Sequence, residues 1–365
     1  MQKLALFLLL LAMVPGRAKA AEPVRGVWLA SVGSEAMLSR DGLRQVVTRC
    51  KRVGLNTIFV VTWNRGYTLY PSQVMQREFG VSIDPRLAGR DPLAELVEEA
   101  HAQGIRVVAW FEFGFSCSYR QADGGPLIAR RPEWAALDPR GRLVSKNGFQ
   151  WMNAFDPEVQ DFVLSLLKEV ATNYDVDGVQ GDDRLPALPV TGGYDRKTKV
   201  LYATQHNGAE PPVDVHNEAW VQWRADRLSE FAERAYRELK AIDSELCVSW
   251  SPSVYPCSKQ NYLQDWPRWV REGWGDLFCP QVYRKDVPAY RECLRQIVEE
   301  QVAPESLSKI APGLLIALAD GYDLPSERVR EMVAANREFG FAGEVFFYYD
   351  GLEQHASVFE DLYDE

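Results

Sequence analysis

The chain has 365 residues, with 51 acidic and 41 basic side chains and a formal net charge of −10. This acidic balance disfavours a nucleic-acid partner, which requires a basic surface. The length is enough for one large domain or two ordinary ones. Aromatic residues make up 12% of the chain, including 11 Trp; most must lie in a core, and some suit the apolar faces of sugar rings.

The first twenty residues are typical of a secretion signal. Lys3 supplies a basic start, residues 4–14 form an apolar run too short to span a membrane, and Ala18-Lys19-Ala20 places small residues at the cleavage-determining positions. We expect cleavage after Ala20, export to the periplasm or the medium, and a mature net charge of −13, because three basic residues and no acids are removed from a chain of charge −10. No later apolar run approaches the length of a membrane span.

Cysteine and histidine usage predicts neither a metal site nor a cofactor. The four histidines lack the spacing of metal ligands. Cys50, Cys247 and Cys279 fall in helix or strand patterns, which predicts buried thiols. Cys117 and Cys257 follow strands and are the better disulfide candidates in an exported protein.

Eight strand-like runs alternate with helix-like runs after the signal. The predicted strands are residues 25–32, 56–63, 106–113, 178–182, 247–251, 276–283, 310–317 and 343–349. The predicted helices are residues 41–53, 92–103, 158–172, 217–242, 262–272, 288–301 and 326–339, with a short helix at the C-terminus. Eight is the closing number of a (β/α)8 TIM barrel, so we expect an α/β fold with a single barrel over residues 21–365. A doubly wound open sheet is the alternative, but no GxGxxG fingerprint follows the first strand.

Long loops are predicted after the third and fourth strands, at residues 114–155 and 184–214. In a barrel these loops lie over the C-terminal face, where active sites are built. The fourth strand itself ends at two adjacent carboxylates, in the run Gln180-Gly181-Asp182-Asp183-Arg184. Strand alternation puts Gln180 and Asp182 on one face, which must be wet or functional because an unpaired buried carboxylate is costly. A helix N-cap or a loop salt bridge is the structural alternative.

Polar and aromatic side chains also follow the other predicted strands. They are Trp63, Asn64 and Arg65 at strand two, Trp110 and Glu112 at strand three, Gln281 and Tyr283 at strand six, Asp320 after strand seven, and Tyr348 and Asp350 at strand eight. Such a rim suits glycoside hydrolysis, in which one carboxylic acid protonates the leaving oxygen and a second carboxylate acts as nucleophile or base. Glu112 could instead pair with Arg65 or Arg184, Asp183 could cap a turn, and Asp350 could cap the last helix. No GxSxG elbow or P-loop is present.

Several of these motifs, in this order, resemble the glycosyl-hydrolase-like family ten, a bacterial family of exported glycosidase-like proteins. They are Arg25-Gly26-Val27-Trp28, residues 110–115, residues 153–159, residues 174–183, Trp223-Arg224-Ala225-Asp226 and residues 280–284. The resemblance runs from about Arg25 to Leu352 and implies a TIM barrel, a retaining or inverting glycosidase and bacterial cell-wall glycan as substrate class. Two positions depart from the family pattern: Asp350 stands where the family carries Glu, and Gly181 stands where a large residue is usual.

We therefore predict an exported glycosidase that acts on a polysaccharide, namely peptidoglycan glycan strands. Asp182 and Glu112 are the predicted catalytic pair, supported by Asp183 and Asp350. The predicted sugar-binding residues are Trp63, Trp110, Gln281, Tyr283, Arg65 and Tyr348. A non-catalytic glycan-binding protein on a degenerate barrel is the main alternative, and a lyase or a metal-dependent deacetylase is a third, the latter disfavoured by the lack of clustered histidines.

Overall fold

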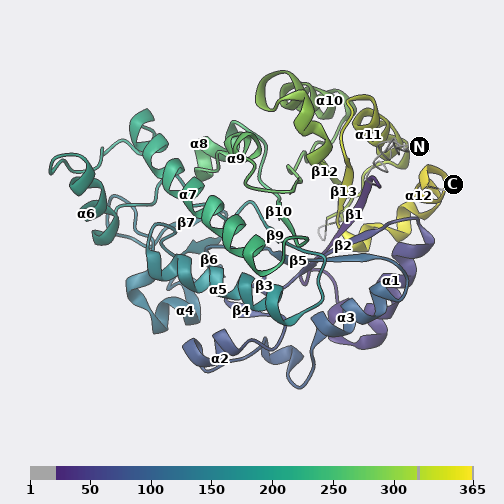
Figure 1. The fold of residues 1–365 in the computed structure, drawn as a ribbon, viewed down its shortest axis with the longest axis horizontal. Coiled ribbons are helices and arrows are strands. Elements are labelled where there is room, and N and C mark those ends of the chain that lie inside the picture. The colour runs from purple at the N-terminus through teal and green to yellow at the C-terminus, as the bar shows by residue number, and fades with distance from the viewer. Residues whose placement is uncertain (1–21, 319–320, 364–365) are drawn as a thin grey trace, which may run out of the picture.

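The computed structural model describes residues 22–318 and 321–363 (Figure 1). The predicted signal peptide and Asp320 lie outside the described residues.

Eight parallel strands form the centre of the fold, as the alternating pattern predicts. They are β1 (Val24–Leu29), β2 (Thr57–Val61), β5 (Arg106–Phe111), β9 (Gly178–Gly181), β10 (Cys247–Trp250), β11 (Leu277–Phe278), β12 (Gly313–Leu315) and β13 (Gly343–Phe347). Their order is β11-β10-β9-β5-β2-β1-β13-β12. Isolated parallel bridges from Phe278 to Ile310 and from Gln281 to Gly313 join the two edge strands, so the curled sheet closes on itself. The TIM-barrel prediction is confirmed.

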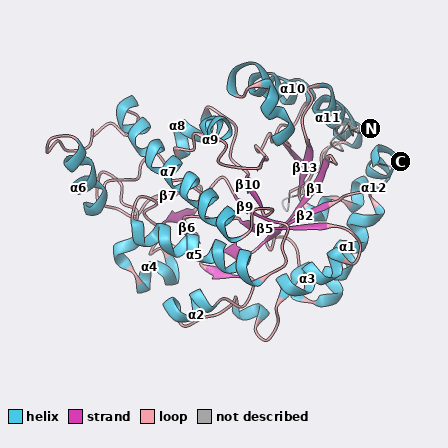
Figure 2. Cartoon of the chain, in the orientation of Figure 1, coloured by secondary structure: helices cyan, strands magenta, loops and turns pink. Residues whose placement is uncertain are grey.

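Helices surround the barrel and lie between successive strands along the chain, with a last helix after the final strand (Figure 2). They are α1 (Arg40–Arg52), α3 (Pro92–His101), α5 (Pro157–Asn173), α7 (Glu218–Ile242), α8 (Cys257–Tyr262), α9 (Trp266–Glu272), α10 (Val287–Gln296), α11 (Ser326–Glu338) and α12 (Ala356–Tyr363). N-capping residues begin α3 and α5 where expected: Asp91 and Asp156 each accept a hydrogen bond from a backbone N–H at the helix N-terminus, and a proline follows each. The predicted helix 262–272 begins later than expected, at Trp266, because Leu263 adopts a left-handed φ of 63° directly after α8.

The loops at the C-terminal ends of the strands carry further structure that the sequence pattern did not indicate. A hairpin of β3 (Trp63–Asn64) and β4 (Tyr67–Thr68) and a small sheet of β6 (Ser116–Tyr119), β7 (Ser145–Lys146) and β8 (Phe149–Trp151) lie there, together with α2 (Gln73–Phe79), α4 (Gly125–Arg130) and α6 (Arg196–Gln205). Gly114 lets two of these loops touch. Its φ is +51°, and a Cβ at this position would lie 2.1 Å from the carbonyl oxygen of Arg184. The loop after β5 therefore packs directly on the loop after β9.

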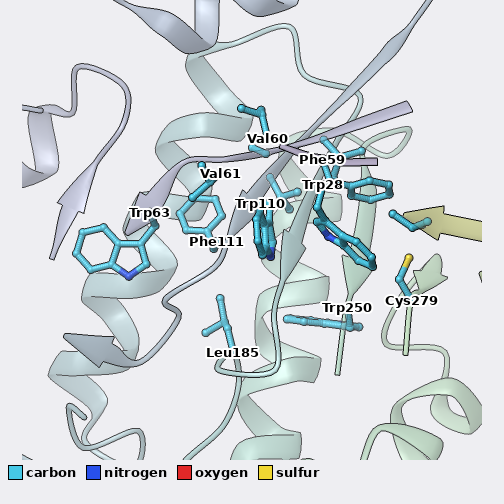
Figure 3. Close-up of a cluster of buried hydrophobic side chains, with 14 of the residues drawn as sticks. Trp28, Phe59, Val60, Val61, Trp63, Trp110, Phe111, Leu185, Trp250 and Cys279 are labelled. Carbon is cyan, nitrogen blue, oxygen red and sulfur yellow. The ribbon is translucent and has the colours of Figure 1, made fainter. Parts of the chain in front are cut away.

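The barrel interior is filled with large side chains and contains a short series of side-chain hydrogen bonds. Trp28 Nε1 donates to Gln180 Oε1 at 2.8 Å, and Gln180 Nε2 donates to Ser249 Oγ at 2.9 Å. These two hydrogen bonds satisfy the amide of Gln180. The inward face of β9 is therefore occupied by structural contacts as far as Asp182. Figure 3 shows the surrounding apolar cluster, to which Trp28, Trp110 and Trp250 contribute.

The cysteine predictions are confirmed only in part. Cys50 and Cys279 are buried free thiols, whereas Cys247 is partly exposed. Cys117 is buried and Cys257 is exposed, and both are free, so the proposed disulfide between them is wrong. No helix among the described residues is long and apolar enough to cross a membrane.

Candidate active site

The two predicted catalytic acids meet at the C-terminal end of the barrel. Glu112 directly follows β5, and Asp182 directly follows β9. These strands are hydrogen-bonded neighbours, with Phe111 opposite Gly181 in the register. Parallel strands place their C-terminal ends at one edge, so the sequence position alone brings the two carboxylates together.

Arg184 is the centre of this acidic cluster. Its Nη2 lies 2.7 Å from Asp182 Oδ2 and 3.5 Å from Glu112 Oε1. Its Nη1 lies 2.9 Å from Asp183 Oδ1, without the alignment of a hydrogen bond. Its Nε donates to the backbone oxygen of Glu112 at 2.8 Å. One guanidinium thus serves three carboxylates, and the alternative in which Glu112 pairs with Arg184 is also realised.

The shared arginine limits the separation of the catalytic pair. Because Arg184 Nη2 lies 2.7 Å from Asp182 Oδ2 and 3.5 Å from Glu112 Oε1, these two oxygens are at most 6.2 Å apart, the sum of the two distances. This upper limit is shorter than the largest separation, about 9.5 Å, at which two carboxyl groups cooperate in glycoside cleavage, so the two acids are not too far apart for that chemistry.

Asp182 is held tightly and is almost inaccessible. Its side chain is 2% exposed, and Gln281 Nε2 donates to its Oδ1 at 2.6 Å. Gln264 Nε2 fixes its backbone oxygen at 3.1 Å. Burial and the charge of Asp183 raise the pKa of Asp182 well above its usual range, and Arg184 opposes them. Gln281 therefore orients an acid, a role that the sequence did not assign to it.

Glu112 lies against a cavity of about 260 Å³. The walls are mainly aromatic and apolar: Phe113, Tyr119, Phe149, Phe347 and Tyr348, with Ala30, Val32, Leu318 and Arg65. Asn64 Nδ2 donates to Glu112 Oε2 in a short hydrogen bond. Burial raises the pKa of Glu112, while Arg184 and Asn64 act in the opposite direction. A carboxyl group with a raised pKa beside a cavity is the arrangement required of a proton donor.

Three of the predicted sugar-binding residues lie at or next to this cavity. Arg65 and Tyr348 line it. Tyr283 packs against Phe347, with 5.4 Å between the ring centroids. Burial and the charges of Asp182 and Asp183 raise the pKa of the Tyr283 phenol, so Tyr283 is close enough to the acids to feel their charge. Tyr119 and Phe149 complete the wall from the loop after β5, and no sequence signal singled them out.

Trp63 and Trp110 are core residues, and their prediction as sugar-stacking platforms is wrong. Trp63 has no exposed surface, donates from Nε1 to Gly114 O at 3.0 Å and packs edge-on against Phe162 of α5. Trp110 is 2% exposed and lies 6.4 Å from Trp28 inside the barrel (Figure 3). The β3–β4 hairpin turns the indole of Trp63 outward toward the core between barrel and α5, whereas strand alternation turns that of Trp110 into the barrel.

Asp350 does not join the acidic cluster, which corrects its predicted supporting role. It lies in a 3-10 turn, Tyr349–Gly351, after β13. Burial raises its pKa, while Ser34 and Arg49 lower it; neither Glu112 nor Asp182 is among the groups that act on it. The groups that act on Asp350 therefore belong to the loop after β1 and to the outer helix α1, not to the acidic cluster. Among residues 22–318 and 321–363, no group of His, Cys, Asp or Glu side chains is arranged to hold a metal ion.

Comparison with known proteins identifies the family of this chain. The model of the family described as glycosyl hydrolase-like 10 matches residues 23–331. The chain is 24% identical over 303 residues to the glycosyl hydrolase DigH of Escherichia coli K12, covering 73% of this chain and 66% of DigH. It is 23% identical over 297 residues to the glycosyl hydrolase YngK of Bacillus subtilis, covering 73% of this chain and 55% of YngK. The chain thus spans less than two thirds of each of these relatives.

Solved structures share the fold at low sequence identity. The glycoside hydrolase domain of PgaB (BpsB) from Bordetella bronchiseptica superposes with a TM-score of 0.67 at 15% identity, covering 94% of this chain and 98% of that one. A catalytic mutant of the β-galactosidase Gan42B from G. stearothermophilus has a TM-score of 0.63 at 11% identity, covering 93% and 56%. The family match extends over most of the barrel and includes both catalytic candidates, so the chain belongs to the glycosyl hydrolase-like 10 family.

Proposed function

We propose that the protein is a glycoside hydrolase that cleaves peptidoglycan glycan strands with two carboxylates, Glu112 and Asp182. The observation that carries the proposal is the pairing of these acids through Arg184 beside an aromatic cavity. A lone buried acid would be explained by packing. Three acids around one cation, at the C-terminal end of a barrel, are explained by chemistry that needs both a proton and a negative charge.

Glu112 is the proton donor in this proposal. It is the acid that lines the cavity, and because of its burial it stays protonated to a higher pH than an exposed glutamate does. Asp182 is the carboxylate that stabilises the positive charge developing on the sugar in this proposal. Arg184 and Gln281 donate to its two oxygens and favour its anionic form, against the burial and the charge of Asp183 that raise its pKa. The limit of 6.2 Å between the two acids, from the distances to Arg184, lies below the ~6.5–9.5 Å of inverting enzymes and supports retention.

The substrate assignment rests on chemistry and on family membership. Aromatic walls suit the C–H faces of sugar rings, and the cavity of about 260 Å³ suits a single ring rather than a long segment. The predicted export would bring the protein to the cell envelope, where peptidoglycan lies. Peptide-free strands are the proposed form, since attached peptides would crowd so small a cavity.

A non-catalytic glycan-binding protein is the second candidate. It is favoured by one observation: Asp182 is 2% exposed and both its oxygens are already occupied. Product analysis separates the two. The protein is incubated with purified peptide-free peptidoglycan, chitin and neutral plant polysaccharides, and the released sugars are separated and identified. Hydrolysis predicts new reducing ends from peptide-free peptidoglycan; retention of the polymer on the protein without new ends favours the binding protein.

A further inference from the structure

Arg65 occupies a backbone position that seldom carries arginine. It is the first residue of the two-residue turn between β3 and β4, with φ of 51°, and Gly66 follows with φ of 80°. Such turns prefer Asn, Asp or Gly, because other side chains pay for a positive φ. The turn nevertheless presents the arginine side chain to the cavity that contains Glu112.

A second arginine lies close by in the same kind of conformation. Arg120, at the end of β6, has φ of 56°. The guanidinium carbons of Arg65 and Arg120 lie 5.7 and 5.1 Å from the ring centroid of Tyr119, which itself lines the cavity. The two guanidinium carbons are therefore at most 10.8 Å apart, the sum of these distances. Two loops distant in sequence thus bring two cations to one aromatic ring.

Within the part of the chain that the structure describes, neither arginine forms an ion pair. Glu112, Asp182 and Asp183 share Arg184 as their ion-pair partner, and Asp84 pairs with Arg86 at 2.7 Å. Arg65 acts on Glu112 and Asp84 only through its field, without a close contact. Both Arg65 and Arg120 are exposed. The chain has a net charge of −10, so two such cations beside one cavity give this place a charge opposite in sign to that of the whole protein. Their field favours an anion at this end of the barrel.

We propose that Arg65, Arg120 and Tyr119 form a subsite for a sugar that bears a carboxylate, so that the enzyme selects acidic over neutral glycans. This inference rests on the proposed function and deepens it. Tyr119 holds the two guanidinium groups beside the cavity, and these groups donate to the carboxylate of the sugar. Peptide-free peptidoglycan meets this requirement because removal of the peptide leaves a free lactyl carboxylate on every second sugar.

The test compares two forms of one ligand. Peptide-free peptidoglycan oligosaccharides are used with the lactyl carboxylates free or converted to neutral amides. Dissociation constants are measured by calorimetry on full-length Glu112→Gln protein, in which no turnover consumes the ligand. Arg65→Gln and Arg120→Gln are added separately to this background. Arg106→Gln is the matched control: Arg106 is exposed at the start of β5, about 20 Å from Glu112 along the same strand.

The subsite predicts that the free acids bind about tenfold more tightly than the amides, and that this preference weakens with added salt. Arg65→Gln and Arg120→Gln should each remove most of the preference, whereas Arg106→Gln should keep it. Equal binding of acid and amide, or an equal loss in Arg106→Gln, overturns the subsite even if the wild type cleaves glycans. Acid-selective binding without cleavage by the wild type would instead sustain the subsite and refute the hydrolase. Lack of binding to either form refutes both.

Discussion

Replacement of Arg184 by methionine should destabilise the protein in a pH-dependent way. The change removes two aligned charge-assisted hydrogen bonds, at 2.7 Å to Asp182 Oδ2 and at 2.8 Å to the backbone oxygen of Glu112. At about 1.5–3 kcal/mol each, their loss amounts to about 3–6 kcal/mol. This agrees with the ~3–5 kcal/mol expected when one partner of a buried ion pair is removed.

The pH dependence follows from the remaining acids. Arg184 lowers the pKa values of Glu112 and Asp182, which burial raises. Without it, both folded-state pKa values rise further above their unfolded values. The folded variant then takes up protons more readily than the folded wild type, so its deficit is largest at alkaline pH and shrinks as the pH falls through the raised pKa values.

The assay is urea unfolding of both proteins at pH 8 and pH 5, with Arg106→Met as control. Arg106 is exposed, so its replacement should change the unfolding free energy by no more than about 0.5 kcal/mol. A deficit in Arg184→Met that is equal at the two pH values, or below about 1 kcal/mol at pH 8, would show that the arginine does not neutralise buried carboxylates.

Three further predictions concern residues outside the acidic cluster. Trp63→Phe should lower the unfolding free energy by about 1–3 kcal/mol, because the hydrogen bond to Gly114 O and part of the core volume are lost, while glycan affinity in a pull-down is unchanged; weakened binding at full stability would return Trp63 to the site. Asp350→Asn should keep turnover within about threefold of the wild type, since its carboxyl lies by Ser34 and Arg49, and a loss of ~10²-fold would refute that placement. Burial raises the pKa of Glu344 from 4.5 to about 7, so its ionisation costs about 3 kcal/mol of stability; this cost grows from pH 4.5 and is complete above pH 7. Glu344→Gln should therefore gain stability relative to the wild type over that pH window. A difference in unfolding free energy that stays constant with pH would contradict the raised pKa.

The barrel was predictable because its signals are local. The strands read as short apolar runs, the helix caps at Asp91 and Asp156 act within a few residues, and the alternation of strands and helices determines the architecture. The same logic located Glu112 and Asp182, since a residue that directly follows a parallel barrel strand must lie at the C-terminal face.

The rest of the site depends on contacts between segments distant in sequence. Trp63 follows a strand, as a platform would, but a two-residue hairpin turns its indole into the core. Tyr119 and Phe149 reach the cavity from a loop whose position depends on the close approach at Gly114. The residue types in these loops carry no period from which such an approach could be read.

The central claim is that Glu112 and Asp182 carry out hydrolysis together. Its most direct test is the rate of reducing-end release from peptide-free peptidoglycan by the wild type, Glu112→Gln and Asp182→Asn, with binding of the same substrate measured in parallel. Both substitutions keep the size of the side chain and remove its charge. The account predicts that each lowers the rate by at least ~10²-fold while binding persists, and that Asp183→Asn costs less. Full activity in either Glu112→Gln or Asp182→Asn would contradict the assignment.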